Sequence, residues 1–170
     1  MSDGARSGGA RDESKRALDL ALRWLAARAR TERELRERLQ QRGVPPGVVD
    51  ATLERLRQWG YVDDRAFAED YVEHTLTVRY IGPRRLVEEL RRRGIDARLA
   101  TEVVAGRLPP DREIDLARAA ARRRLEMWRK GDPAAMRGRL YRFLTGRGFD
   151  PETAARVVRE HLGDEEAGFP

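Results

Sequence analysis

The chain has 170 residues, of which 38% are charged and only 6% aromatic, so its core must consist largely of Leu, Val and Ala, which favours helices over sheets. Its 35 basic residues outnumber its 29 acidic residues and give a formal net charge of +6, which suits a polyanion or an acidic protein surface as a partner. The lack of cysteine excludes disulfides and thiolate metal sites, and without a membrane-length apolar run or a signal-peptide core we expect a cytoplasmic protein with no membrane partner.

The N-terminal part of the chain predicts a tail followed by three helices. Residues 1–13 are small, polar and glycine-rich, which is typical of a disordered tail. Helices are expected over residues 14–29, 32–43 and 46–59. Thr31 and Glu34 fit a capping box at the start of the second helix, because the hydroxyl and the carboxylate each satisfy a free backbone donor there. The inward face of the first helix is expected to consist of Leu18, Leu22 and Leu25.

The segment from Gly60 to Asp64 predicts the link to a second set of helices. Its glycine ends one helix, Tyr61 and Val62 are expected to pack back on that helix, and Asp63 caps the next one. This next helix carries Phe67 on an aromatic face. Two further helices are expected between Gly82 and Leu108.

A third set of helices is expected after the prolines at positions 109 and 110. These prolines break the chain, and a longer helix is expected to run from there to Lys130. The eighth helix is expected to end near Gly146. Asp150 and Pro151 then supply the N-cap and the first position of the ninth helix, and residues 163–170 form an acidic tail.

The three sets share one pattern, in which two leucines precede an Arg-Gly pair at the end of the second helix. The positions are Leu35, Leu39 and Gly43, then Leu86, Leu90 and Gly94, then Leu140, Leu144 and Gly148. Leucines four apart share a helical face, and a glycine after the last turn adopts the left-handed conformation that ends the helix. The sequence therefore predicts an all-α, elongated array of about nine helices in three tandem, helix-turn-helix-like repeats, with boundaries at 14–60, 61–108 and 109–162.

Enzyme activity is not expected. The serines lie in or beside the N-terminal tail, and the two histidines, His74 and His161, fall in different repeats, so a nucleophile and its base are not brought together. Three pairs of adjacent acids offer ligands for Mg²⁺, but neighbours on a helix point about 100° apart, which disfavours a nuclease. We expect no catalytic residue, cofactor or metal ligand. The acidic pairs are Asp63-Asp64, Glu69-Asp70 and Glu88-Glu89.

Clusters of arginine are the remaining functional candidates. Such clusters are common on solvated helix faces, but along a repeat array they also suit a nucleic acid or a nucleoprotein. Readout of a DNA sequence is disfavoured, because the second helices of the pattern begin with residues that are poor base readers. By charge density, the expected contacts with a polyanionic partner are Arg79, Arg84, Arg85, Arg92 and Arg93 in the middle repeat and Arg122, Arg123 and Arg129 in the last.

Motifs in the middle and last repeats are characteristic of one bacterial protein family. They are Gly60-Tyr61-Val62-Asp63-Asp64 followed by Phe67-Ala68, Gly82-Pro83-Arg84-Arg85-Leu86 with Glu89-Leu90 and Arg93-Gly94-Ile95, and Leu140-Tyr141-Arg142-Phe143-Leu144 with Arg147-Gly148-Phe149. On these motifs the chain resembles the RecX family, the bacterial regulators of the RecA recombinase. The resemblance extends from about Ser14 to Leu162. It departs from the family at Ala66, where a basic residue is usual, and at Gly146, where a basic or polar residue is usual.

The resemblance implies a non-enzymatic modulator in recombination, DNA repair and the SOS response. Such a protein binds along the groove of the RecA-DNA filament and negatively regulates its growth, ATPase, strand exchange and coprotease activity. We expect a monomer whose further partner is single- or double-stranded DNA. Two alternatives stay open: a general DNA-binding helical array that acts by competition for DNA, and, with less support from the charge excess, a scaffold without a nucleic-acid role. The motif residues expected to be structural are Gly60, Tyr61, Asp63, Asp64, Phe67, Gly82, Leu86, Leu90, Gly94, Leu140, Leu144, Gly148 and Phe149.

Overall fold

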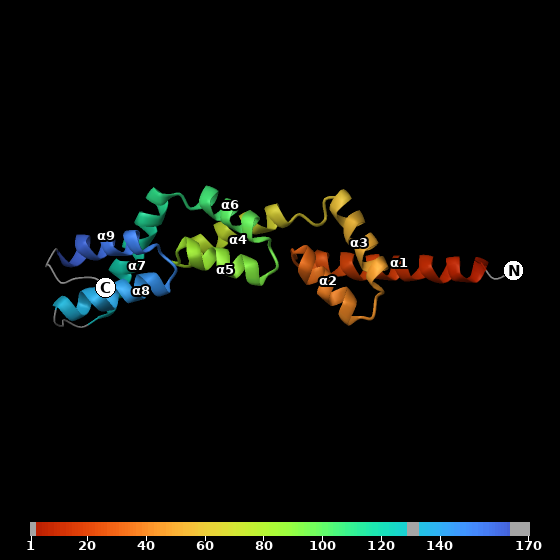
Figure 1. The fold of residues 1–170 in the computed structure, drawn as a ribbon, viewed down its shortest axis with the longest axis horizontal. Helices are drawn as coiled ribbons and strands as arrows, with labels where there is room; N and C mark the ends of the chain where they lie inside the picture. Colours follow the sequence, from red (N-terminus) through yellow and green to blue (C-terminus); the bar gives the residue numbers. More distant parts are fainter. Residues whose placement is uncertain (1–2, 129–132, 164–170) are drawn as a thin grey trace. The chain divides into compact units, whose positions relative to one another are not determined.

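The computed structural model describes residues 3–128 and 133–163, and within these ranges the chain forms nine helices and no strand (Figure 1). The helices are α1 (Asp3–Ala27), α2 (Glu32–Gln41), α3 (Pro46–Gln58), α4 (Asp64–Val78), α5 (Pro83–Arg92), α6 (Ala97–Arg107), α7 (Pro110–Met127), α8 (Pro133–Gly146) and α9 (Pro151–Leu162). The all-α prediction and the order of the helices are confirmed. The expected end of the seventh helix at Lys130 and most of the acidic tail lie outside the described residues.

The chain divides into two compact units. Unit 1 runs from the N-terminus to Ala68 and includes Arg92–Asp96, while unit 2 holds Glu69–Arg91 and the chain from Ala97 onward. The division crosses both α4 and α5. It follows spatial packing rather than the sequence repeat, so the repeat boundaries at 14–60, 61–108 and 109–162 stay a prediction.

Helix α1 differs from the prediction at its start and on its inward face. It begins at Asp3, so residues 3–13, expected to be a disordered tail, are helical. Extension of an existing helix adds one hydrogen bond per residue, whereas nucleation is the unfavourable step, so a helix anchored by its packed end can extend into a polar segment. On the inward face Ala17 and Ala21 are fully buried, while the expected leucines are only partly buried. Small side chains allow close approach there, and the leucines pack around them.

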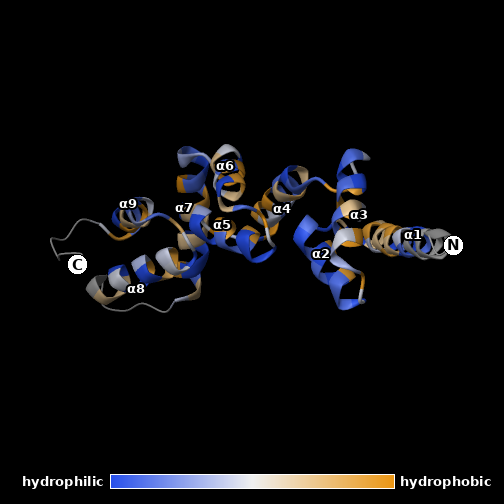
Figure 2. Cartoon of the chain, turned by 45° about the vertical axis from the view of Figure 1, so that its right-hand side comes forward, coloured by the Kyte–Doolittle hydropathy of each residue, from blue (hydrophilic) through white to orange (hydrophobic). Residues whose placement is uncertain are grey.

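The core of unit 1 lies where α1, α2 and α3 meet. Leu35 and Leu39 of α2 and Leu53 of α3 are fully buried there. The hydrophobic segments of α1 and α3 lie next to each other in Figure 2. Burial of one such leucine side chain stabilises the fold by about 1.5–3 kcal/mol, so the second helix of the repeat is anchored by its two pattern leucines.

Unit 2 contains the equivalent core in the last repeat. Ala117, Ala120 and Ala121 of α7 pack there together with residues of α8 and α9. The pattern residues Leu140, Leu144 and Phe149 are fully buried in this core, and Leu86 and Leu90 are fully buried in α5. All five are therefore core residues, and their assignment as structural motif residues stays a prediction.

The predicted helix ends are formed by glycines in the left-handed conformation. Gly94 has φ of +92° and Gly148 has φ of +87°, and Gly43 and Gly60 also have positive φ. A Cβ on Gly148 would lie 2.5 Å from the backbone nitrogen of Arg85. Gly148 is thus required both by its backbone conformation and by a neighbouring helix that leaves no room for a side chain.

Caps at the helix starts agree with the prediction only in part. Thr31 accepts a hydrogen bond from the backbone of Glu34 at 3.1 Å, but the Glu34 carboxylate forms ion pairs with Arg28 and Arg93 rather than completing the capping box. Asp63 caps α4 as expected, accepting from the backbone nitrogens of the two residues at positions 65 and 66 at 2.9 Å each.

Two motif residues have different roles from those expected. Tyr61 does not pack inward: it is 57% exposed and lies edge-on to Trp59, with ring centroids 6.4 Å apart, while Val62 alone enters the core. Asp150 stands at the N-cap of α9, but its carboxylate makes no cap hydrogen bond and instead accepts from Arg84 at 2.7 Å. An available guanidinium offers a stronger, charge-assisted partner than a backbone N–H.

Candidate anion-binding cleft

Two of the arginines expected to make contacts in the middle repeat hold a carboxylate of the chain itself. Arg79 donates two hydrogen bonds to Glu89, each of 2.9 Å, and Arg85 donates a third at 3.2 Å. The Tyr71 hydroxyl donates to the same carboxylate at 2.7 Å. Burial acts to raise the pKa of Glu89, but the hydrogen bonds from Arg79, Tyr71 and Arg85 outweigh it and lower the pKa to about 2. Arg79 and Arg85 therefore have a structural role in unit 2.

The other expected contacts are distributed between ion pairs and an arginine-rich helix. Arg84 pairs with Asp150 at 2.7 Å, and Arg93 pairs with Glu34 at 3.6 Å. Arg92 is exposed at the end of α5. The remaining three expected contacts belong to the last repeat: Arg122 and Arg123 are exposed on α7, and Arg129 lies outside the described residues.

Arginines on α7 divide into two groups by partner. Arg118 binds acidic groups, with Asp115 at 3.0 Å and Glu160 at 2.7 Å. Arg123 and Arg124 instead lie over aromatic rings. The guanidinium carbon of Arg123 is 5.9 Å from the ring centre of Tyr80, and that of Arg124 is 5.0 Å from the ring centre of Phe143. Cation–π contacts hold a guanidinium in place without neutralising its charge.

These cation–π contacts continue into a row of alternating guanidinium and aromatic groups across α7 and α8, which we call the arginine–aromatic ladder. Its distances between guanidinium carbon and ring centre range from 4.5 to 5.3 Å. In order, the ladder consists of Arg147, Phe143, Arg124, Trp128 and Arg139. It fixes three guanidiniums on rigid helices.

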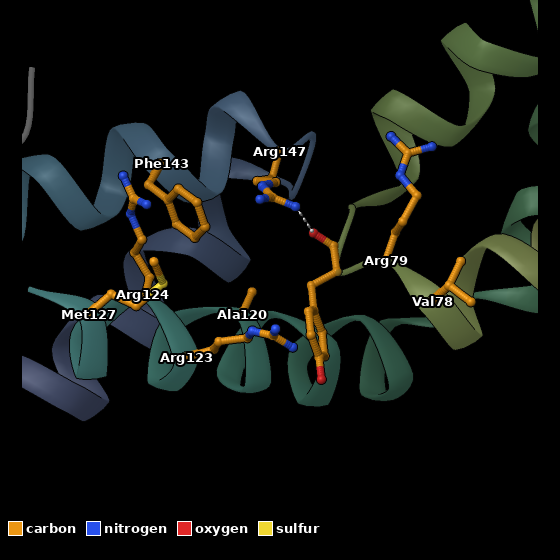
Figure 3. Close-up of a pocket in the computed structure, with 9 residues that line it drawn as sticks. Val78, Arg79, Ala120, Arg123, Arg124, Met127, Phe143 and Arg147 are labelled. Atoms are coloured by element: carbon orange, nitrogen blue, oxygen red, sulfur yellow. Dashed lines mark hydrogen bonds between the residues drawn. The ribbon is translucent and has the colours of Figure 1, made fainter.

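A cleft of about 250 Å³ in unit 2 opens beside this ladder. Figure 3 shows Arg123 and Arg124 extending from α7, Phe143 from α8, and Arg147 from the turn directly after α8. Arg79 also contributes to the wall, but its guanidinium points away from the other three and holds Glu89. The cleft is lined by Val78, Arg79, Tyr80, Ala120, Arg123, Arg124, Met127, Phe143 and Arg147, none of which is acidic. We refer to it as the arginine cleft.

The electrostatics of the arginine cleft are those of an unneutralised cationic site. Arg147 donates to the backbone carbonyl of Tyr80 at 3.3 Å, and the pKa of Arg147 is lowered by burial and then by repulsion from Arg85, Arg79 and Arg124. The buried Nε of Arg124 has no hydrogen-bond partner among the described residues. An anion in the cleft would relieve the repulsion among these guanidiniums, so the charge favours an anionic ligand.

The rim of the arginine cleft is apolar. Val78 is 62% exposed and Met127 is 71% exposed, although large hydrophobic side chains are normally buried. The cleft therefore combines cationic groups, aromatic faces and exposed apolar surface within a small volume. Such a combination suits a ligand that carries both an anionic group and a flat apolar one.

Sequence reasoning missed several lining residues of this cleft. Arg147 was assigned only to the turn of the repeat, although its spacing of four from Phe143 on one helix was a usable signal. Tyr80 stands in a connector that carries no pattern, and Arg124 was one arginine among several on α7. Among the residues of unit 2 given a contact role from the sequence, Arg79 and Arg123 do line the cleft.

In residues 3–128 and 133–163 there is no group of three or more His, Asp or Glu side chains placed to hold a metal ion. None of the helices described is both long enough and apolar enough to cross a membrane.

Comparisons with known proteins identify one family over nearly the whole chain. The models of the first, second and third RecX three-helix domains match residues 17–56, 63–104 and 111–158. "Regulatory protein RecX" of Thermobifida fusca is 39% identical over 99% of this chain and 92% of its own length. "Regulatory protein RecX" of Streptomyces coelicolor is 34% identical over 91% of this chain and 87% of its own length.

Solved structures show the same fold. A crystal structure of RecX from Lactobacillus salivarius has a TM-score of 0.82 at 17% identity, over 88% of this chain and 96% of that one. A second crystal structure of regulatory protein RecX has a TM-score of 0.84 at 23% identity, over 97% of this chain and 80% of that one. Together the domain matches and the sequence identities confirm the resemblance and the three tandem domains: the chain belongs to the RecX family of regulatory proteins.

Proposed function

We propose that this chain is a non-enzymatic regulator of the RecA recombinase that binds along the groove of the RecA-DNA filament. There it negatively regulates filament growth, ATPase, strand exchange and coprotease activity. Membership of the RecX family across three tandem domains supports the regulatory role. The observation that carries the contact with the filament is the arginine cleft, because its guanidiniums face no carboxylate on its own walls.

The contact with the filament is assigned first to the arginine cleft and to the exposed face of α7. Arg79, Arg84 and Arg85 already hold carboxylates of unit 2. If such a guanidinium moved to a partner, its carboxylate would be left unpaired, and that cost would offset the new interaction. Arg123 has no such cost, since it lies over a ring and is exposed. The same cost applies to Arg93, which pairs with Glu34, while Arg92, Arg122 and Arg129 stay in the proposal as further contacts.

Binding along a filament also explains the use of three domains. A filament presents the same surface at regular intervals, so several modest contacts on one chain act together at a high effective concentration. We propose that the protein acts as a cytoplasmic monomer, because this multivalency needs no second copy of the chain.

The test is an ATPase and light-scattering assay on preformed RecA filaments on single-stranded DNA, with this protein added far below the RecA concentration. Loss of ATPase and of scattering at such ratios supports direct regulation of the filament. Inhibition only near saturation of the DNA would replace the proposal with a general DNA-binding array, because competition for DNA cannot act at low stoichiometry. An unchanged ATPase and filament at all ratios would refute both.

Two variants on α7 test whether the inhibition of RecA depends on the arginine cleft. Arg123→Gln removes a cleft guanidinium, and Arg118→Gln removes the same charge from the same helix at a residue that already binds Asp115 and Glu160. We expect about tenfold more of the Arg123→Gln protein to be needed for half-maximal inhibition, because a charge-assisted contact with the partner is lost. The Arg118→Gln protein should stay within about twofold of the wild type, because it loses only an exposed ion pair within the chain. Equal loss in both would remove the cleft from the proposal.

A further inference from the structure

We infer that the arginine cleft is a binding site for one nucleotide of single-stranded nucleic acid, with the backbone phosphate on Arg124 and Arg147 and the base against Tyr80 and Arg123. This inference rests on the proposed function and deepens it by naming the chemical group of the filament that unit 2 binds. Four properties of the cleft carry the inference: its charge, its stacking surfaces, its apolar rim and its size.

The positive charge of the cleft favours an anion that has more than one anionic oxygen. Arg124 and Arg147 both lie against Phe143, with guanidinium carbons 5.0 and 5.1 Å from its ring centre. Both belong to the ladder, so they are held in place before a ligand arrives. A phosphodiester offers two anionic oxygens that guanidinium forks bind in a planar, charge-assisted geometry.

The stacking surface is the pair formed by Tyr80 and Arg123. The Arg123 guanidinium lies 5.9 Å from the ring centre of Tyr80, and both residues line the cleft. Unstacked bases bind proteins by stacking on aromatic rings and on guanidinium planes. Val78 and Met127, both exposed at the rim, extend this surface with apolar contacts. A carboxylate-bearing peptide would pair with the guanidiniums but would not stack on these flat surfaces.

The size excludes a duplex. At about 250 Å³ the cleft is slightly smaller than the ~300–1,000 Å³ of common small-molecule sites, so it admits one nucleotide unit and not a base pair. A base reaches such a site only when it is free of its partner and of its neighbours in the stack. Single-stranded nucleic acid meets this requirement without an unpairing cost.

The first experiment measures the binding of a short fluorescein-labelled oligothymidylate to the full chain by fluorescence anisotropy over a range of salt concentrations. We expect Arg123→Gln to weaken binding about tenfold, because its guanidinium stacks on the base, and to leave the slope of log affinity against log salt unchanged, because that slope counts phosphate contacts. Arg118→Gln, the matched control, should stay within about twofold. Equal loss in both variants would overturn the inference, because only diffuse charge would then matter. Circular dichroism melting of each variant confirms that the fold is retained.

The second experiment separates base from phosphate. An abasic oligomer with the same number of phosphates should bind the wild type about tenfold more weakly than oligothymidylate does, because stacking of the base is lost. Tyr80→Leu should reduce this difference between the two oligomers, because one of the two stacking surfaces is lost. Equal affinity of the wild type for both oligomers would refute stacking. Displacement of the oligothymidylate by a polyglutamate peptide of equal charge at equal concentration would refute the nucleotide and favour a carboxylate partner.

Failure of this inference can be distinguished from failure of the proposed function. If the wild type inhibits RecA at low stoichiometry but the cleft variants bind the oligonucleotide with wild-type affinity, the nucleotide site is wrong and the proposed regulatory function is supported. If the variants change oligonucleotide binding as described while RecA filaments are unaffected at every ratio, the nucleotide site is supported and the regulatory function is wrong.

Discussion

Thr31 donates its hydroxyl proton to the backbone carbonyl oxygen of Arg93 over 2.7 Å, within unit 1. Gly82 makes the corresponding bond within unit 2, from its backbone N–H to the carbonyl oxygen of Arg147 over 2.9 Å. Thr31 and Gly82 occupy the same place in their repeats, just before the second helix, and both acceptors belong to an Arg-Gly pair. The Arg-Gly turn therefore ends one helix and also binds the start of another.

Thr31→Val should destabilise unit 1. Thr31 is fully buried, accepts from the backbone of Glu34 and donates to Arg93, so valine of similar shape removes a cap and a hydrogen bond. We expect a loss of about 2 kcal/mol in the free energy of unfolding, measured by urea denaturation. Thr31→Ser keeps the hydroxyl and serves as the control, with a loss of less than about 1 kcal/mol. A loss as large in the serine variant would show that packing of the methyl group, and not the hydrogen bonds, is what matters.

Gly148→Ala should destabilise unit 2 by about 3 kcal/mol or more. The positive φ of 87° costs any other residue about 1–2 kcal/mol, and the added Cβ would lie 2.5 Å from the backbone nitrogen of Arg85, which cannot move aside as a flexible side chain would. Gly146→Ala, in α8 and with open space around the new Cβ, should instead stabilise by up to about 1 kcal/mol. Thermal melts of the two variants that shift in the same direction would contradict this explanation.

Glu89 should make stability depend on pH in the acid range. Its folded pKa of about 2 is below its ordinary value of 4.5, so its contribution is fully present above pH 4.5 and is lost as the pH falls toward 2. A shift of this size corresponds to about 3 kcal/mol of stability. Solvent screening reduces this value little, because the carboxylate is only 17% exposed. Glu89→Gln should lower the stability at neutral pH and flatten its decline in acid, as followed by urea denaturation over that pH range.

Glu113 should show the opposite pH dependence. Its side chain is buried and accepts from the backbone nitrogen of Asp150 at 2.9 Å, and burial raises its pKa above the ordinary 4.5. The stability that this group contributes is thus fully present below pH 4.5 and is lost as the pH rises through the folded pKa. Glu113→Gln keeps an acceptor and carries no charge, so it should match or exceed the wild type at neutral pH.

Truncation of Glu113 tests the acceptor itself. Glu113→Ala leaves the backbone N–H of Asp150 without its partner and should cost about 2 kcal/mol in urea denaturation at neutral pH. If the alanine and glutamine variants were equally stable, the hydrogen bond to Asp150 would have no measurable role at the start of α9.

The order and type of the helices, and their division into three repeats, could be predicted from the sequence because they depend on neighbours in the chain. Leu35 and Leu39 lie one turn apart on one face, and Gly43 ends their helix through its own backbone conformation. The same reasoning placed Leu140 and Leu144 in the core. It failed for α1, because close packing selected Ala17 and Ala21 over the larger leucines.

The role of each arginine was decided only by the tertiary structure. In the sequence Arg118 and Arg123 are alike, two basic residues of one helix. Folding brings Glu160 to the first and the ring of Tyr80 to the second, so one is neutralised and the other keeps its charge. A cation's partner comes from whichever element packs against it, and this is a property of the assembled helices. The sequence alone therefore determined the repeats, and packing determined which charges remain available to bind.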